Sequence, residues 1–241
     1  MSKRKLDSSA AEDWQKLQRR IVRCRKCPRL VEHCKAIAVK KRKAYADQKY
    51  WGKPVENFGQ GRASLLVMGL APGAHGANRT GRMFTGDRSG DWLYRAMHKF
   101  GFASQAESID RDDGLQMINT VVSGVCHCAP PDNKPTREEI TNCQPFLEQT
   151  VAAVEPKVIL ALGRLAWTET LRLAKVLQWL SKTDPKPPKF CHGAEHQFSN
   201  EVWLLASYHP SQQNTFTGRL TEAMFNRVFN RARKLCDDRD G

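Results

Sequence analysis

The chain has 241 residues, 40% of them hydrophobic and 27% charged, which is an ordinary composition for one globular domain. Its charge balance is unusual, because 39 Lys and Arg face 25 Asp and Glu and leave a net charge of +14. Such an excess favours a polyanion, above all nucleic acid, as the partner. A membrane surface would instead require a basic amphipathic helix, and no apolar run in the sequence is long enough to cross a bilayer.

The N-terminus lacks the apolar segment of a secretory signal. We therefore expect a cytoplasmic, nucleoid-associated protein in a reducing compartment. There, the eight cysteines would be metal ligands or small buried residues rather than disulfide partners. Residues 1–12, with the charge run Lys3-Arg4-Lys5, are predicted to be a disordered basic tail, and residues 13–241 a single domain. A monomer is the default expectation.

Short apolar runs alternate with segments of helical periodicity along the whole chain. The runs predict strands at residues 64–70, 117–122, 157–162 and 202–206. Helices are predicted between them, and residues 182–194 are predicted to be an exposed loop. This alternation indicates a three-layer α/β/α sandwich around a central, mostly parallel four-stranded sheet. Active sites in such folds lie beyond the carboxyl ends of the strands, so the informative loops should follow Leu70, Val122 and Ala206.

Half of the cysteines have a spacing that suits one metal centre: Cys24, Cys27, Cys128 and Cys143. A Cys-x-x-Cys pair offers two thiolates from one turn, and two remote thiolates would tie the N-terminal segment to the sheet. Zinc and a 4Fe–4S cluster both accept four cysteines, but the unequal spacing favours iron–sulfur. Buried free cysteines are the alternative. We assign that role to the remaining four, although Cys126 could also supply a ligand: Cys34, Cys126, Cys191 and Cys236.

A Gly-rich loop at residues 69–87 follows the first predicted strand and reads GLAPGAHGANRTGRMFTGD. The segment 128–135 reads CAPPDNKP, and Ser207-Tyr-His-Pro-Ser211 follows the last strand. Together with the opening Cys-x-x-Cys, these motifs resemble family 5 of the uracil-DNA glycosylase superfamily, in the family's order and over nearly the whole chain. The loop has no Gly-Lys-Ser/Thr pattern, which argues against a nucleotide hydrolase.

The resemblance implies a monofunctional DNA glycosylase of base-excision repair. Such an enzyme flips a damaged base out of DNA and hydrolyses its N-glycosidic bond, which leaves an abasic site. The expected substrates are uracil, hypoxanthine, xanthine and modified pyrimidines in double-stranded DNA, with single-stranded DNA left open. The resemblance also implies a structural 4Fe–4S cluster on Cys24, Cys27, Cys128 and Cys143.

Glycosidic cleavage builds positive charge on the sugar and negative charge on the departing base, so it needs a carboxylate and a hydrogen-bond donor. Many relatives place the carboxylate directly after the first strand, where this chain has Leu70 and Ala71. The resemblance therefore points to Asp87, which could instead only cap the next helix. His209 matches the donor and is expected to be neutral, with a structural strand-end His as the alternative. Phe84 matches the residue that stacks on the flipped base, with a core Phe as the alternative.

The other predicted site residues form two groups. The base-binding wall is expected to comprise Gly69, Leu70, Ala71, Pro72, Gly73 and Asn133, with Asn119 as a weaker candidate. Contacts with DNA are expected from Arg79, Arg82, Arg88, Ser211, Gln212, Gln213, Asn214 and Arg219. No role is assigned to His75. A non-enzymatic, metal- or cluster-stabilised nucleic-acid-binding protein is the alternative function, but it would not explain the Gly-rich loop paired with His-Pro-Ser.

Overall fold

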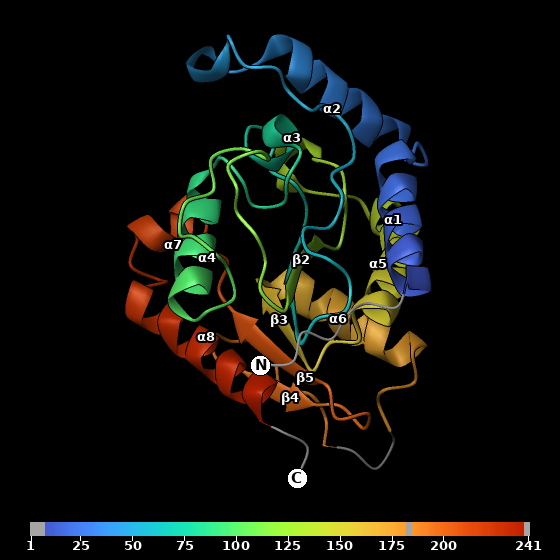
Figure 1. Cartoon of the computed structure of the whole chain (residues 1–241), viewed down its shortest axis with the longest axis vertical. Helices are drawn as coiled ribbons and strands as arrows, with labels where there is room; N and C mark the ends of the chain where they lie inside the picture. Colours follow the sequence, from blue (N-terminus) through green and yellow to red (C-terminus); the bar gives the residue numbers. More distant parts are fainter. Residues whose placement is uncertain (1–7, 182–184, 239–241) are drawn as a thin grey trace.

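The computed structural model describes residues 8–181 and 185–238. Its centre is a five-stranded sheet in the order β2-β1-β3-β5-β4 (Figure 1). The strands are β1 (Leu65–Gly69), β2 (Thr120–Gly124), β3 (Val158–Leu162), β4 (Glu195–Gln197) and β5 (Trp203–Ser207). All neighbours pair in parallel except β4, which runs antiparallel to β5. The mostly parallel α/β fold is confirmed, with one more strand than predicted.

Helices surround the sheet, and two short 3₁₀ turns lie in the connections (Figure 1). The helices are α1 (Ser8–Arg23), α2 (Pro28–Lys40), α3 (Ala77–Thr80), α4 (Arg88–Lys99), α5 (Arg137–Val154), α6 (Arg164–Val176), α7 (Gln212–Phe216) and α8 (Glu222–Asp237). The 3₁₀ turns are η1 (Lys43–Tyr45) and η2 (Pro131–Asn133). Helix α1 begins inside the segment predicted to be a tail, whereas the charge run Lys3-Arg4-Lys5 lies outside the described residues. Among these helices, none is long and apolar enough to cross a membrane.

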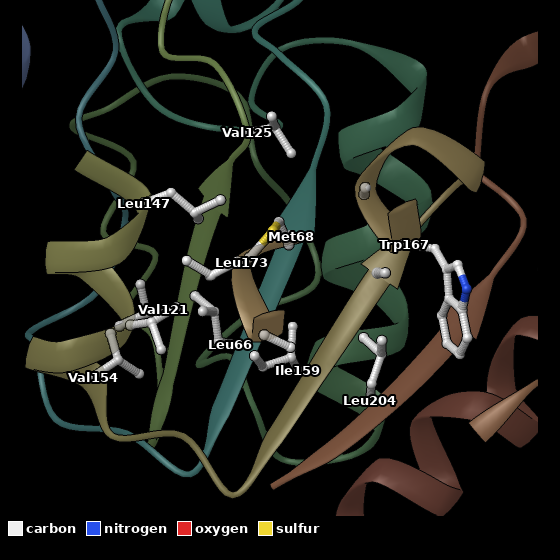
Figure 2. Close-up of a cluster of buried hydrophobic side chains, with 14 of the residues drawn as sticks. Leu66, Met68, Val121, Val125, Leu147, Val154, Ile159, Trp167, Leu173 and Leu204 are labelled. Atoms are coloured by element: carbon white, nitrogen blue, oxygen red, sulfur yellow. The ribbon is translucent and has the colours of Figure 1, made fainter. Parts of the chain in front are cut away.

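Alternate residues of each parallel strand face opposite layers. Leu66, Val121 and Ile159 pack with α1, α5 and α6, and Figure 2 shows their side chains gathered on that face. Leu65 and Leu160 point the other way and pack with α4 and α8. Every residue of β1, β2 and β3 is buried, as expected for a parallel sheet covered on both sides.

The strand order reverses between β1 and β3. From β1 the chain crosses to β2 on one side, and it then returns to β3 on the other side. At such a switch point the connecting segments diverge and leave a crevice beyond the carboxyl ends of the two strands. The fold therefore places a binding site after Gly69 and Leu162.

Short antiparallel pairings occur at both sides of the sheet. On one side the three residues of β4 pair with β5. On the other, Phe58 forms an isolated bridge with Val122 of β2, with both backbone N–H···O bonds made between the two residues. Three residues are too few to show a periodic pattern, which is why β4 was not predicted. Strand β2 begins later than predicted, because Asn119 has a left-handed backbone with φ of 49°.

A buried polar network ties α1 to the sheet and to α5. The Asn57 side chain donates to Thr150 Oγ1 at 3.0 Å and to Gln18 Oε1 at 3.1 Å, and it accepts from Ser123 Oγ at 2.6 Å. Gln18 also donates to the Asn57 carbonyl at 2.6 Å. Asn57 is only 3% exposed, so its partners would stay unsatisfied if its amide were removed.

We expect Asn57→Ala to lower the free energy of unfolding by about 1–3 kcal/mol, because it leaves buried donors and acceptors unpaired. Urea denaturation followed by circular dichroism measures the change. The nearby exposed Gln60→Ala is the control and should shift it by no more than about 0.5 kcal/mol. Equal effects of the two substitutions would contradict the role of the network.

Candidate active site

A cavity of about 620 Å³ lies at the switch point of the sheet. Its floor is formed by the segments that leave β1 and β3, and its walls by the loops before α4, after β2 and after β5. Most of the predicted site residues line it: Gly69, Leu70, Ala71, Pro72, Gly73, Phe84, Asp87, Asn133, His209, Ser211 and Gln212. Residues far apart in the sequence therefore meet in one concave site, which is where ligand sites in α/β folds occur.

The two carboxylate oxygens of Asp87 have different surroundings. One oxygen, Oδ1, accepts a hydrogen bond from the Gly90 N–H at 3.0 Å and caps α4. The other, Oδ2, lies against the Gly-rich loop, so close that a methyl group on Gly76 would overlap it. Burial raises the pKa of Asp87, although backbone hydrogen bonds from Gly90 and Ser89 oppose the shift. Asp87 thus caps a helix and also offers a partly desolvated carboxylate at the cavity.

Phe84 is held in an uncommon backbone conformation at the cavity wall. Its φ is 53°, in the left-handed region that a bulky residue rarely adopts. The ring lies over the end of β1, where a Cβ on Gly69 would come within 2.6 Å of Phe84 Cζ. The surrounding chain therefore fixes the ring where it forms part of the cavity, rather than in the core.

His209 stacks on the ring of Phe84, with the ring centroids 5.8 Å apart and the planes 29° apart. Burial lowers the pKa of His209 to about 4, so its imidazole is neutral at pH 7. The Asn214 side chain donates to the His209 carbonyl at 2.9 Å, and Ser211 caps the short helix α7 that carries Asn214. These contacts set the position of a neutral ring that can donate one N–H.

The residues predicted to contact DNA lie in three settings. Gln212, Gln213 and Arg219 are exposed beside the cavity, and the Arg219 guanidinium lies 4.8 Å from the Tyr208 ring centroid. Exposed Arg88 lines the cavity and stacks on exposed Phe216. Ser211 and Asn214 are half-buried, whereas Arg79 and Arg82 are buried.

Arg79 and Arg82 are 7% and 5% exposed, so the predicted phosphate contacts of these two residues do not fit the structure. Arg82 forms a bidentate pair with Asp113 at 2.8 and 2.6 Å and also donates to Thr85 and Ser108. Arg79 donates to the carbonyls of His75 and Gly86. Both guanidinium groups brace the Gly-rich loop from inside, since charged donors inside a protein require full pairing.

Asn119 and several unpredicted residues complete the comparison with the sequence. Asn119 bonds to Ser64 at the amino end of β1, away from the cavity, so it is not a base reader. The turn after β3 was overlooked although it supplies a whole wall: Leu162, Gly163, Arg164, Leu165 and Ala166. Its only signal was Gly163, whose φ of 98° lets β3 turn directly into α6. Arg42 and Tyr45, from the N-terminal segment, were also not predicted to reach the site.

A second, much smaller cavity lies between the start of α2, the segment after β2 and α5. All four cysteines predicted to be ligands line it, together with apolar residues such as Leu30 and Phe146. Within the described part of the chain, no group of three or more His, Cys, Asp or Glu side chains is arranged to hold a single metal ion. Four thiols around one cavity are a donor set that both zinc and a 4Fe–4S cluster accept.

Each of the two remote cysteines predicted to be ligands has a further cysteine beside it. Cys126 lies beside Cys143, and Cys34 lies beside Cys128. Neither Cys34 nor Cys126 lines the small cavity.

The structure is that of a doubly wound α/β protein whose cavity at the switch point carries an aromatic platform, a half-buried carboxylate and a neutral histidine. A sequence model of the Uracil DNA glycosylase superfamily matches residues 56–233. The chain is 48% identical to a type-5 uracil-DNA glycosylase of Mycobacterium leprae, with 95% of this chain and 98% of that protein covered. Two proteins of Pyrobaculum aerophilum, one of type 5 and one of type 4, show to which branch of the superfamily the chain is more similar. The type-5 enzyme is 42% identical over 88% of this chain and 89% of its own length. The type-4 enzyme is 30% identical over 64% of this chain and 62% of its own length. The chain belongs to the uracil-DNA glycosylase superfamily, and within it to the type-5 family.

The buried pair of Arg82 and Asp113 generates a stability prediction. Asp113 has its pKa lowered to about 2, because hydrogen bonds from Arg82 and two backbone N–H groups outweigh the effect of burial. A carboxylate with a depressed pKa stabilises the fold above its unfolded value of about 3.9, and this contribution is lost as the pH falls towards 2. We expect Asp113→Asn to cost about 3–5 kcal/mol at pH 7, since the Arg82 charge stays buried without its partner.

Denaturation of both proteins across pH 2 to 7 measures this difference. The difference in the free energy of unfolding between the two proteins should shrink below about pH 4, where the Asp113 carboxylate of the wild type takes up a proton. Exposed Asp110→Asn, in the same loop, is the control for the loss of one negative charge. A difference that does not depend on pH would contradict the assignment.

Proposed function

We propose that the protein excises uracil and other deaminated or damaged bases from DNA by hydrolysis of the N-glycosidic bond, which leaves an abasic site. The observation that carries this proposal is the convergence of Phe84, Asp87 and His209 on one cavity. The net charge of +14 suits a polyanionic substrate. We further propose that it acts as a monomer on duplex DNA and works in the cytoplasm on the nucleoid.

Each of the three side chains has a part in the proposed reaction. A base flipped into the cavity would stack on the Phe84 ring. The Asp87 oxygen that does not cap α4 would orient the attacking water and stabilise the positive charge that develops on the sugar. His209 is neutral, so it would donate an N–H to the base oxygen as the leaving base becomes an anion.

A broad range of bases is proposed from the chemistry of the cavity wall. Leu70, Ala71 and Pro72 contribute apolar side chains where a uracil-only site would need a fixed pattern of polar groups. A site rejects an analogue strongly only when it buries polar groups that the analogue leaves unpaired. The cavity of about 620 Å³ is also roomy enough for a purine. These features support hypoxanthine, xanthine and modified pyrimidines as further substrates.

Purified protein incubated with duplexes that carry a single uracil or hypoxanthine tests the activity directly. Alkali-dependent strand cleavage at both bases is the expected result, because an abasic site breaks only under alkali. Cleavage at uracil alone would keep the glycosylase but refute the broad range. Salt-sensitive DNA binding without cleavage would favour the non-enzymatic alternative.

Asp87→Asn should lower the single-turnover excision rate by about 10²–10⁴-fold while DNA binding persists, since the carboxylate acts on the transition state. Because burial raises the pKa of Asp87, the wild-type rate should decline with falling pH already above the ordinary aspartate value of about 3.9. The neighbouring exposed Asp91→Asn, in the first turn of α4, is the matched control and should retain the rate, while its pH profile shifts slightly towards lower pH, because the Asp91 charge helps to raise the pKa of Asp87. Full activity of Asp87→Asn would overturn the assignment.

We also propose that Cys24, Cys27, Cys128 and Cys143 hold a structural 4Fe–4S cluster. When bound, the cluster would cross-link the start of α2 to the segment after β2 and to α5. The support is the shared cavity with its four thiol donors, together with the unequal spacing of the cysteines in the sequence.

Protein purified without oxygen should contain iron and acid-labile sulfide in equal amounts and absorb broadly in the visible range. Cys128→Ala should lose iron and lower the melting temperature, whereas exposed Cys191→Ala should change neither. Buried Cys126→Ala tests the alternative ligand. Zinc in place of iron, or iron retained in Cys128→Ala and lost in Cys126→Ala, would contradict the proposal.

A further inference from the structure

His75 lies in the Gly-rich loop and lines the cavity, yet the proposed reaction gives it no part. Its Nδ1 is 3.0 Å from the hydroxyl of Tyr50, a residue only 7% exposed. That hydroxyl accepts a hydrogen bond from the Arg42 backbone N–H at 3.3 Å. Within the described ranges the hydroxyl has no other acceptor for its own proton, so it donates to His75 Nδ1. The ring proton of His75 then resides on Nε2, and His75 presents a fixed N–H donor.

The backbone of His75 is held as firmly as its ring. Buried Arg79 donates from Nε to the His75 carbonyl at 2.8 Å. The Arg79 guanidinium also lies 4.0 Å from the centroid of the Tyr45 ring, which forms the neighbouring part of the cavity wall. Arg79 therefore fixes the loop that carries His75 against the segment that carries Tyr45. A donor held by this many contacts needs little reorganisation to bind a ligand.

Arg42 brings a positive charge to the same side of the cavity. It follows α2, and its side chain is exposed and makes no hydrogen bond or ion pair with any described residue, while it also lines the cavity. The Arg42 charge is close enough to His75 to help burial lower the pKa of His75, which keeps the ring neutral. Lys40, Lys41 and Lys43 flank Arg42 in the sequence. This rim thus combines one unpaired cation with one neutral donor.

We propose that Arg42 and the Nε2–H of His75 form a rim subsite for a backbone phosphate of the DNA strand whose base occupies the cavity, with Tyr50 as the positioning residue. The inference rests on the proposed function and adds a phosphate contact to it. A nucleotide flipped into the cavity leaves its flanking phosphates at the mouth, where a guanidinium and an N–H can share the oxygens of one phosphate. The edge of a neutral base is the alternative ligand, but its recognition would not need the formal charge of Arg42.

Binding is measured by fluorescence anisotropy on a duplex with a single tetrahydrofuran abasic analogue, over a series of salt concentrations. Arg42→Ala should weaken binding about tenfold at low salt, and its plot of log affinity against log salt should be shallower by about 0.9. His75→Ala should weaken binding severalfold with an unchanged slope, because the ring is neutral. Arg62→Ala, which removes an exposed charge at the opposite end of β1, is the matched control for net charge and should keep the wild-type slope.

Tyr50→Phe keeps the aromatic ring but frees the His75 tautomer. It should weaken binding in the wild-type background and much less in His75→Ala, where only the bond to the Arg42 backbone N–H remains to be lost. A purely structural role of Tyr50 would give equal effects in the two backgrounds. Duplexes with one methylphosphonate at each position near the lesion locate the contact. A methylphosphonate at one of these positions should weaken DNA binding by the wild type and leave DNA binding by Arg42→Ala unchanged.

Two results would overturn the inference while leaving the glycosylase intact. One is an Arg42→Ala salt slope equal to that of the wild type. The other is a His75→Ala variant with wild-type affinity and an altered preference between uracil and hypoxanthine, which would make His75 a base reader. Failure to excise uracil at all is a separate outcome and concerns only the proposed function.

Discussion

The proposed site depends on how the carboxylate of Asp87 is held between α4 and the Gly-rich loop. Helix α4 holds one oxygen through the Gly90 N–H, and the absence of a side chain at Gly76 leaves room for the other. A helix cap and a chemical role are usually treated as competing explanations of an Asp residue that precedes a helix. Here the cap is the means of positioning, since a carboxylate anchored by one oxygen presents the second in a single orientation.

The electrostatics of the cavity follow from its depth and from charges at its rim. Desolvation acts in opposite directions on the two central groups: it raises the pKa of Asp87 and lowers that of His209. A proton donor without charge and a carboxylate in a partly dry setting are therefore both present near neutral pH. Among the cations that line the cavity, Arg42 and Arg88 are exposed.

What could be predicted from the sequence was whatever leaves a local pattern. Apolar runs located four strands, and motif order located Phe84, Asp87 and His209. Burial of a charged residue leaves no such pattern: Arg82 looks like a surface residue until Asp113, 31 positions away, is folded against it. Likewise, nothing in the basic run after α2 marks Arg42 as part of a cavity wall, because that proximity arises only from tertiary packing.

The short edges of the sheet have a consequence for a protein that must gather on a polymer. Many copies attracted to one DNA molecule meet at high local concentration, where an open strand edge would recruit its neighbours into an extended sheet. The edge strand β4 has only three residues, and on the other edge Phe58 bridges the middle of β2. Copies crowded on the substrate therefore present only short or interrupted strand edges at which aggregation could begin.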